Sequence, residues 1–396
     1  MSAGAASAAS SQGPAPPARP LLALAHAGMF TFGLVMALIG AVVPTLTGTL
    51  SLTLGNVGTM FLAMNFSMLM ASLVVGLVMD RAGLKLPLVA GAWLVAVALV
   101  LVGRASSYTL LLPAVACLGF GGGALNTGTN TLVADLHDDP ARKAAALNLL
   151  GVFFGFGALL LPLSIGALTT RLGVSSLLVA AAVLSALMGL LAAARPFPAP
   201  KQRHGWPLAQ LPRFAGQPLV RVMGVLLFFQ SGNEFLLGGY VASFLTREMQ
   251  LSVAAASYAL AGFWAAIMLS RAVLSRLLLR VGAPLVVFWG ALAAAGGAVV
   301  IALAPSAGLA IAGAILTAVA LAGVFPSALG FTGARFEEHS GTVFGILFTV
   351  ALCGGMTIPW VAGHLAEAAG LRWVFALAAA NSVVVAVAMA VARRRG

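Results

Sequence analysis

Residues 220–245, VRVMGVLLFFQSGNEFLLGGYVASFL, form an apolar run that is long enough to cross a lipid bilayer as one helix. The run nevertheless contains a carboxylate, Glu234. The other acidic residues of the chain lie where we expect loops or helix ends. A carboxylate at membrane depth is unfavourable unless it is paired or neutralised, so it is rare and indicates a functional site. We therefore take Glu234 as the leading candidate for binding a solute or a proton.

The composition of the whole chain indicates a membrane protein. Its 396 residues are 61% hydrophobic and only 8% charged, whereas about a quarter of the residues of a soluble protein are charged. The apolar residues occur in blocks of roughly 20 to 27, which suits membrane-spanning helices and exceeds the length of barrel strands. We predict an all-α membrane protein in a lipid bilayer, with no separate soluble domain.

The apolar blocks predict twelve membrane-spanning helices. A basic, proline-containing connection at 195–218 separates an N-terminal bundle of six helices, 20–194, from a C-terminal bundle of six, 219–396. Residues 1–19 lack the apolar core of a signal peptide, so we expect a disordered cytoplasmic tail. The expected spans are 21–47, 56–79, 85–103, 108–133, 144–171, 174–194, 219–245, 254–279, 284–304, 307–331, 340–366 and 371–392.

The basic residues predict the orientation of these spans. With both termini in the cytoplasm, Arg104, Arg171, Arg247 and Arg372 are the only ones of 21 basic residues that fall outside. Basic residues are enriched in cytoplasmic loops, so we expect this orientation in a bacterial-type inner (plasma) membrane. The same distribution accounts for the net charge of +12, which would indicate nucleic-acid binding in a soluble protein.

Several classes of site find no support in the sequence. Both cysteines lie in apolar spans, and the five histidines are scattered, so we expect neither a disulfide framework nor a metal site. The chain carries no P-loop, nucleophile elbow or catalytic triad. We expect a monomer that is not an enzyme and has no cofactor.

The stretch 76–85, GLVMDRAGLK, joins the second and third spans. It resembles the G-x-L-x-D-R-x-G-R-K loop of the major facilitator superfamily, and the matching positions are Gly76, Asp80, Arg81, Gly83 and Lys85. Leu84 departs where the family usually has Arg. The resemblance implies two pseudo-symmetric six-helix bundles and a gating loop in which the charged pair holds the bundles together on the cytoplasmic side. The stretch 270–282 in the second half keeps Arg and Gly without the Asp and is similar to a decayed copy.

Two polar clusters within the spans are candidate binding residues. Asn126 and Asn130 share one face of the fourth span because they lie four residues apart. They either line a polar cavity or form hydrogen bonds between helices. In the seventh span, Gln230, Asn233 and Glu234 share a face, on which Tyr240 follows two turns later.

Asn65 in the second span is a weaker candidate, since such a residue is more typical of helix packing. Pro326 and Pro359 are expected to kink their helices because each lacks a backbone donor.

These clusters also resemble the fucose/hexose–proton symporter branch of the superfamily. Members carry L-E-x-x-x-N in the fourth helix, where this chain has Leu125-Asn126 and then Asn130. Asn126 therefore stands where relatives have an acid, and an amide carries no proton at neutral pH. The runs at 323–327, GVFPS, and 335–345, RFEEHSGTVFG, are similar to that branch as well.

The resemblance implies a secondary transporter that moves a small polar solute, a sugar being the first candidate, together with protons by alternating access. Glu234 would then be the proton carrier. Two other functions remain open: a proton-antiport exporter of drugs or metabolites, and a membrane sensor or scaffold without transport. Glu234 itself is alternatively a buried residue that stays protonated or is paired with a polar neighbour.

Overall fold

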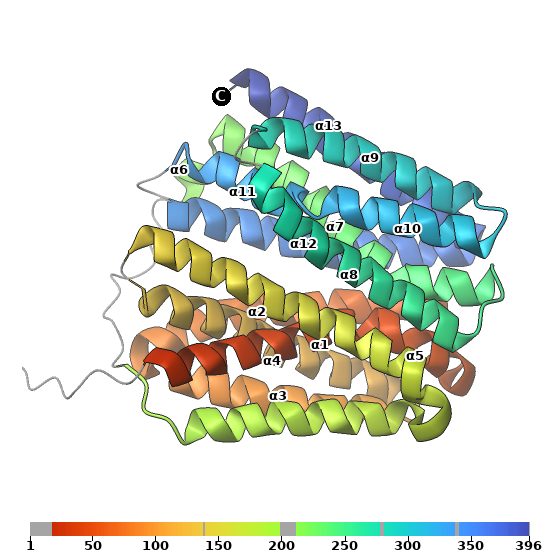
Figure 1. Ribbon diagram of the computed structural model, residues 1–396, viewed down its shortest axis with the longest axis horizontal. Helices are drawn as coiled ribbons and strands as arrows, with labels where there is room; N and C mark the ends of the chain where they lie inside the picture. The colour runs from red at the N-terminus through yellow and green to blue at the C-terminus, as the bar shows by residue number, and fades with distance from the viewer. Residues whose placement is uncertain (1–17, 138, 199–210, 278–280, 337–339, 396) are drawn as a thin grey trace, which may run out of the picture.

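The computed structural model describes residues 18–395 except for 138, 199–210, 278–280 and 337–339 (Figure 1). Most of the predicted tail, 1–19, and the middle of the predicted linker, 195–218, lie outside the described residues. Within the described ranges the regular structure is entirely helical. The prediction of an all-α protein is confirmed.

The first half of the chain forms α1 (Ala18–Leu50), α2 (Leu54–Ala82), α3 (Lys85–Arg104), α4 (Tyr108–Asp135) and α5 (Pro140–Ala193). α5 unites the predicted spans 144–171 and 174–194, which meet at a kink where Gly173 has a φ of 71°. Glycine accepts this left-handed φ without a steric penalty, so the helix changes direction here. Local signals set the starts of two helices: a capping box of Thr53 and Asn56 precedes α2, and Asp139 caps α5.

The second half forms α7 (Pro218–Arg247), α8 (Val253–Leu277), α9 (Ala283–Leu303), α10 (Ala307–Leu321), α11 (Val324–Gly333), α12 (Ser340–Ala369) and α13 (Arg372–Arg395). A short helix, α6 (Leu211–Ala215), lies in the linker. The predicted single span 307–331 corresponds to one membrane-crossing stretch, Ala307–Gly333, which is broken into α10 and α11. Pro326 lies in the first turn of α11, where its missing N–H is tolerated. α12 continues through Pro359 as one helix.

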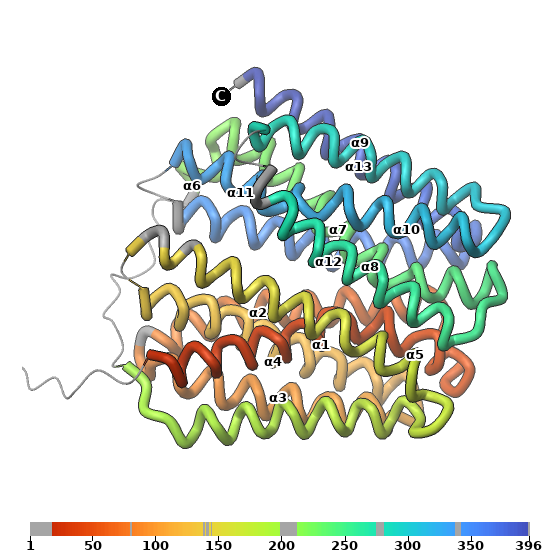
Figure 2. The backbone as a smooth tube through the Cα atoms, viewed as in Figure 1, coloured from red at the N-terminus to blue at the C-terminus, as the bar shows by residue number. Residues whose placement is uncertain are grey.

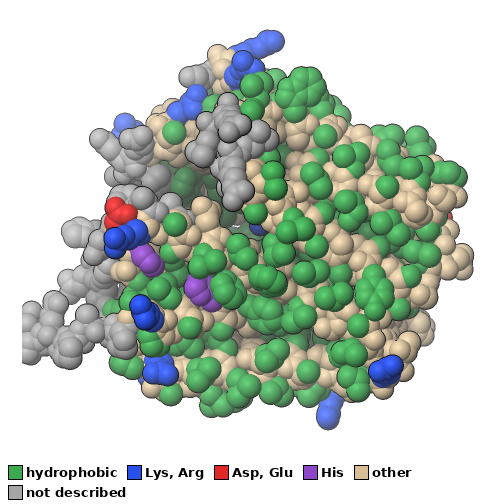
Figure 3. Space-filling view, viewed as in Figure 1, with side chains coloured by type: hydrophobic (Ala, Val, Ile, Leu, Met, Phe, Trp, Pro, Cys, Tyr) green, Lys and Arg blue, Asp and Glu red, His purple; other side chains and the backbone are tan. Residues whose placement is uncertain are grey.

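Ten helical stretches in the described residues are long and apolar enough to span a membrane. One of them is the kinked α5, which is long enough for two crossings, and another combines α10 with α11. α7 is not among the ten, since its polar segment QSGNE lowers its hydropathy. Counting both arms of α5 and adding α7 gives the twelve crossings predicted. The face seen in Figure 3 is mostly hydrophobic, with charged side chains mainly near its edges.

The helices form two bundles, α1–α5 and α7–α13, which lie side by side in Figures 1 and 2. The main contacts between them join α2 with α12, α5 with α8, and α1 with α7, and α1 also contacts α8. The start of α1 and the end of α13 lie at the same end of the molecule as α6, and we call this the linker end (Figure 1). The far end carries the turns between α1 and α2 and between α7 and α8. The predicted architecture of two repeated bundles is confirmed.

Candidate functional site

Glu234 lies halfway along α7 and forms an ion pair with Arg271 of α8. The Nη2 of Arg271 donates to Oε1 of Glu234 at 3.4 Å, and its Nε donates to the carbonyl of Ala322, just beyond α10. The Glu234 side chain is 17% exposed and that of Arg271 is 32% exposed. Opposite charges at membrane depth stabilise one another, so each is tolerated because of the other.

The predicted orientation counts Arg271 among the basic residues on the cytoplasmic side, whereas the predicted span 254–279 includes it; the structure supports the span. Arg271 lies inside α8, and its guanidinium reaches the carboxylate in the middle of the neighbouring helix. The stretch 270–277 likewise belongs to α8 rather than to a loop.

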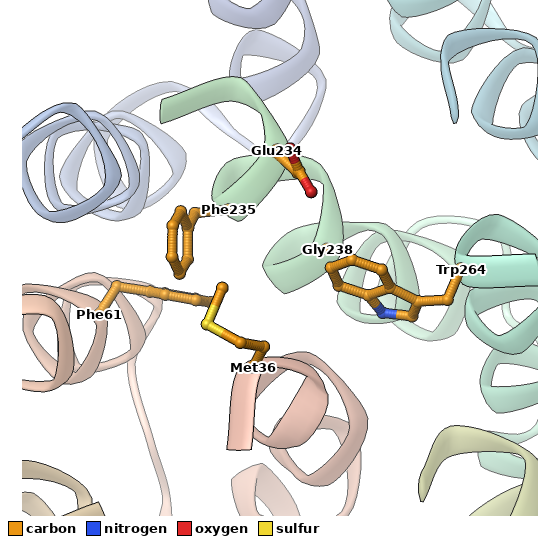
Figure 4. Close-up of a pocket in the computed structure, with 6 residues that line it drawn as sticks. All are labelled: Met36, Phe61, Glu234, Phe235, Gly238 and Trp264. Atoms are coloured by element: carbon orange, nitrogen blue, oxygen red, sulfur yellow. The ribbon is translucent and has the colours of Figure 1, made fainter. Parts of the chain in front are cut away.

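A small cavity lies beside Glu234 between the two bundles (Figure 4). α1 and α2 contribute Met36 and Phe61, and α7 and α8 contribute the rest of the lining, namely Glu234, Phe235, Gly238 and Trp264. In this conformation the cavity has room for about one water molecule. A larger solute would enter only if these side chains or the bundles moved apart.

The walls of this cavity are mainly aromatic. Phe61 packs edge-on against Phe235, with ring centroids 6.2 Å apart, and Trp264 packs edge-on against Phe154 at 6.3 Å. The buried indole Nε1–H of Trp264 has no hydrogen-bond acceptor among the described residues. The site thus offers mainly apolar surface beside one ion pair.

The two bundles are in direct contact between this cavity and the far end. Gly40 of α1 lies against the backbone of Gly238 and Gly239 in α7, so closely that a β-carbon at position 40 would overlap the Gly238 carbonyl. In the same turn of α7, the hydroxyl of Tyr240 donates to the carbonyls of Pro359 at 2.9 Å and Leu54 at 3.4 Å. Tyr240 therefore joins α7 and α12 to the start of α2.

Two charged side chains add contacts at the far end itself. Arg247 donates to Thr47 Oγ1 at 3.3 Å, between α7 and α1. Oε1 of Glu367 accepts the backbone N–H of Gly55 at 2.9 Å, which caps the start of α2 with a carboxylate from α12. A helix N-terminus carries a partial positive charge, so this contact is favourable. These contacts close the far end.

The remaining predicted residues lie apart from Glu234. Asn233 is fully buried and faces α13, where its amide donates to the carbonyl of Ala378 and to Ser382, and accepts from Asn381. Gln230 donates to the carbonyl of Leu321, while its Oε1 is buried without a partner in the described part of the chain.

On α4, Asn130 donates to the backbone and side-chain oxygens of Asn126 at 2.9 and 3.0 Å. Asn65 is fully buried, and its amide donates to the carbonyl of Phe61. Of the predicted binding residues, Glu234 alone lines the described cavity.

The predicted gating loop lies at the linker end. α2 ends at Ala82, and Gly83 closes the turn with a φ of 76° and an N–H bonded to the Met79 carbonyl at 3.0 Å. Lys85 begins α3. The side chain of Asp80 lies outside the described residues, so the predicted contact of the charged pair with the other bundle stays a prediction. No group of three His, Cys, Asp or Glu in the described ranges is arranged to hold a metal ion.

Two facing bundles of membrane-spanning helices with a cavity between them are the architecture of many secondary transporters. The profile of the Major Facilitator Superfamily matches residues 25–232 and 223–396. The chain belongs to the major facilitator superfamily, which confirms the resemblance seen in the loop 76–85, and it is a transporter rather than an enzyme. Comparison with curated protein sequences finds no match.

Solved transporter structures share the fold. One is a bacterial homologue of the human lysosomal transporter Spinster in an inward-facing, unoccupied conformation, with a TM-score of 0.77, 18% identity, and coverage of 96% of this chain and 97% of that one. A point mutant of the nucleoside transporter NupG gives a TM-score of 0.78 and 15% identity over 94% of this chain and 99% of that one. A point mutant of the Escherichia coli fucose:proton symporter FucP gives a TM-score of 0.66 and 19% identity over 94% and 98%.

The sequence carried a signal for Arg271 that the charge pattern obscured. Arg271 lies well inside the predicted span 254–279, and a charged residue within a span normally pairs with another one. Glu234 was the only carboxylate expected at membrane depth, so the pair followed from the two spans together. The contact of Glu367 with Gly55 could not be predicted from the sequence, because it depends on the start of α2 lying beside α12 in the fold.

Proposed function

We propose that the protein moves a small polar solute across the membrane by alternating access, coupled to protons through Glu234. The observation that carries this proposal is the Glu234–Arg271 ion pair beside a cavity that both bundles line. A carboxylate held there is able to take up a proton from one side and release it to the other.

Alternating access supplies the other half of the mechanism. The contacts of Gly40, Tyr240, Arg247 and Glu367 close the far end in the present conformation. If both termini are cytoplasmic in an inner membrane, as the basic residues suggest, the present conformation is closed to the outside. Rocking of the bundles would break these contacts, and the loop at Asp80 and Arg81 would then stabilise the opposite state.

A sugar is the first substrate class to test, because the sequence resembles the fucose/hexose branch and the fold is shared with a fucose:proton symporter. A proton-antiport exporter is the alternative, and the direction of solute movement under an imposed pH gradient separates the two. A sensor or scaffold would show no solute flux and would tolerate loss of Glu234. A thermal-shift screen against sugars and organic acids gives the first ligand, since binding to the folded state raises its apparent stability.

The test of proton coupling is Glu234→Gln in proteoliposomes. The substitution keeps the size of the side chain and removes its titratable proton, so uphill uptake driven by a pH gradient should be lost. Glu248→Gln is the matched control: Glu248 is an exposed residue just beyond the end of the same helix, and its loss should leave uptake intact. Full pH-driven uptake by Glu234→Gln would refute the proposed coupling.

A further inference from the structure

We propose, on the basis of the proposed function, that the transported solute is an organic anion with an apolar body and that Arg271 binds its carboxylate. The proposal names a chemical class for the substrate and a specificity-determining residue outside the predicted set. It follows from the charges of the site, its lining, and the contact of Arg271 with Glu234, which lines the cavity.

The charges of the site favour an anion over a neutral solute. In the described state, ionised Glu234 and Arg271 neutralise one another. Protonation of Glu234 removes the negative charge and leaves Arg271 unpaired at membrane depth, which is unfavourable. A solute carboxylate on Arg271 restores neutrality, whereas a neutral sugar leaves one uncompensated positive charge.

The same charges explain obligatory coupling. The empty site and the site loaded with one proton and one monoanion are both neutral. The site that holds the proton alone carries a positive charge, and the site that holds the anion alone carries a negative charge. Because charged intermediates are disfavoured during the rocking of the bundles, proton and anion cross together in a ratio of one to one. Transport is then electroneutral.

The lining of the cavity suits an apolar body. Met36, Phe61, Phe235 and Trp264 surround the space beside Glu234, and Phe61 and Met36 reach toward it from the first bundle (Figure 4). Each amide predicted to bind sugar hydroxyls already has a partner within the protein: Asn126 and Asn130 bond to each other, and Asn233 bonds to α13. The side-chain oxygens of Gln230 and Asn65 have no partner in the described part of the chain, but neither residue lines this cavity. The cavity itself therefore offers a sugar few polar contacts.

The position of Arg271 places it to receive a carboxylate. It follows Trp264 by seven residues, which is two turns along the same face of α8 toward the linker end. Its guanidinium has five N–H donors, and the described contacts use one at Nε and one at Nη2. A planar carboxylate suits the guanidinium because it accepts two parallel hydrogen bonds.

The test uses two matched pairs of probes on the purified full-length protein: glucuronate against glucose, and phenylacetate against phenylacetamide. Both acids stay ionised at pH 6 and at pH 8, while the neutral partners have nearly the same size. Thermal unfolding is measured for the wild type, Glu234→Gln, Arg271→Gln and Arg271→Lys. Arg104→Gln, at an exposed position at the end of α3, is the control for loss of a positive charge.

We expect at least one carboxylate to raise the melting temperature of the wild type while its neutral partner does not. Binding should tighten on acidification by up to about tenfold per pH unit, since one proton is taken up with the anion. Glu234→Gln should bind the same anion equally at pH 6 and pH 8, because its side chain is neutral at both. Arg271→Gln should lose the response, Arg271→Lys should keep part of it, and Arg104→Gln should match the wild type.

The proposal would be overturned if, in Glu234→Gln, each acid and its neutral partner shifted the melting temperature equally, or if neither shifted it. A folding defect of Arg271→Gln is bypassed by the double variant Glu234→Gln/Arg271→Gln, which has no unpaired charge and should show no anion response. If glucose binds instead, and Glu234→Gln abolishes its pH-driven uptake, the proposed function stands and the anion proposal falls. If the carboxylate binds selectively while Glu234→Gln keeps pH-driven uptake, the anion site stands and the coupling role of Glu234 falls.

Discussion

Gly40→Ala should open the far end of the transporter. Gly40 faces Gly238 across the contact between α1 and α7, and an added β-carbon would overlap the Gly238 carbonyl and lie 3.3 Å from the Cα of Gly239. Both neighbours are backbone atoms, so no side-chain rotation relieves the overlap. The helices must separate, and only the conformation with the far end closed brings them together.

The size of the effect follows from this overlap. Overpacking by a methyl group costs about 1–3 kcal/mol. If about 2 kcal/mol falls on the closed conformation alone, the ratio of closed to open molecules drops about 30-fold. Gly48→Ala is the matched control, because Gly48 lies on the same helix with no neighbouring atom within 4 Å of an added β-carbon.

Electron–electron distance measurements between spin labels give the readout. Ser106 and Ser306 are exposed, lie at the far end of different bundles, and accept labels after replacement by cysteine in a background without Cys117 and Cys353. Gly40→Ala should shift the distance distribution to longer values, and Gly48→Ala should leave it as in the wild type. An unchanged distribution for Gly40→Ala would refute the reasoning that the α1–α7 contact defines the closed state.

Three further substitutions test contacts of the same framework. Tyr240→Phe removes the hydrogen bond to Leu54 at the start of α2, which crosses between the bundles, and a second one to Pro359 within its own bundle. It should favour far-end opening by about 1 kcal/mol in the same distance measurement; an unchanged or shorter distance would contradict this. Asn233→Ala leaves buried partners on α13 unsatisfied, so it should lower the thermal stability by about 2–3 kcal/mol, and an unchanged melting temperature would exclude this packing role. Glu367→Gln weakens the cap on Gly55 and should favour opening by less than about 1 kcal/mol, an effect that salt should diminish in the wild type; salt-independent opening would argue against an electrostatic contact.

Much of the fold could be predicted from the sequence because a bilayer leaves few alternatives. An apolar run of helical length must be a helix there, since its backbone groups have no other partners. The loop 76–85 then identified the superfamily. The boundary between the predicted spans 144–171 and 174–194 is confirmed by the kink at Gly173 in α5. The break between α10 and α11 was missed because apolar content continues through it, and only local backbone geometry marks it.

The candidate site was predictable only in part. Glu234 stood out because a charged residue within a long apolar run can be recognised from the sequence alone. The sequence does not show which helix packs against each face of a span. Gln230, Asn233 and Glu234 were expected to share one site, yet Asn233 faces α13 and Glu234 faces α8. Adjacent positions on a helix point about 100° apart, so the identity of the neighbouring helix decides which polar residue reaches the interface between bundles.

Proton movement in proteoliposomes tests the central claim most directly. Vesicles that enclose a pH-sensitive dye receive an inward gradient of the identified solute, and internal acidification is followed alongside exchange of labelled for unlabelled solute. The account predicts acidification with the wild type and with Glu248→Gln. It predicts exchange without acidification with Glu234→Gln, whose neutral side chain still permits solute binding. Acidification by Glu234→Gln at the wild-type rate would contradict the claim that Glu234 carries the proton.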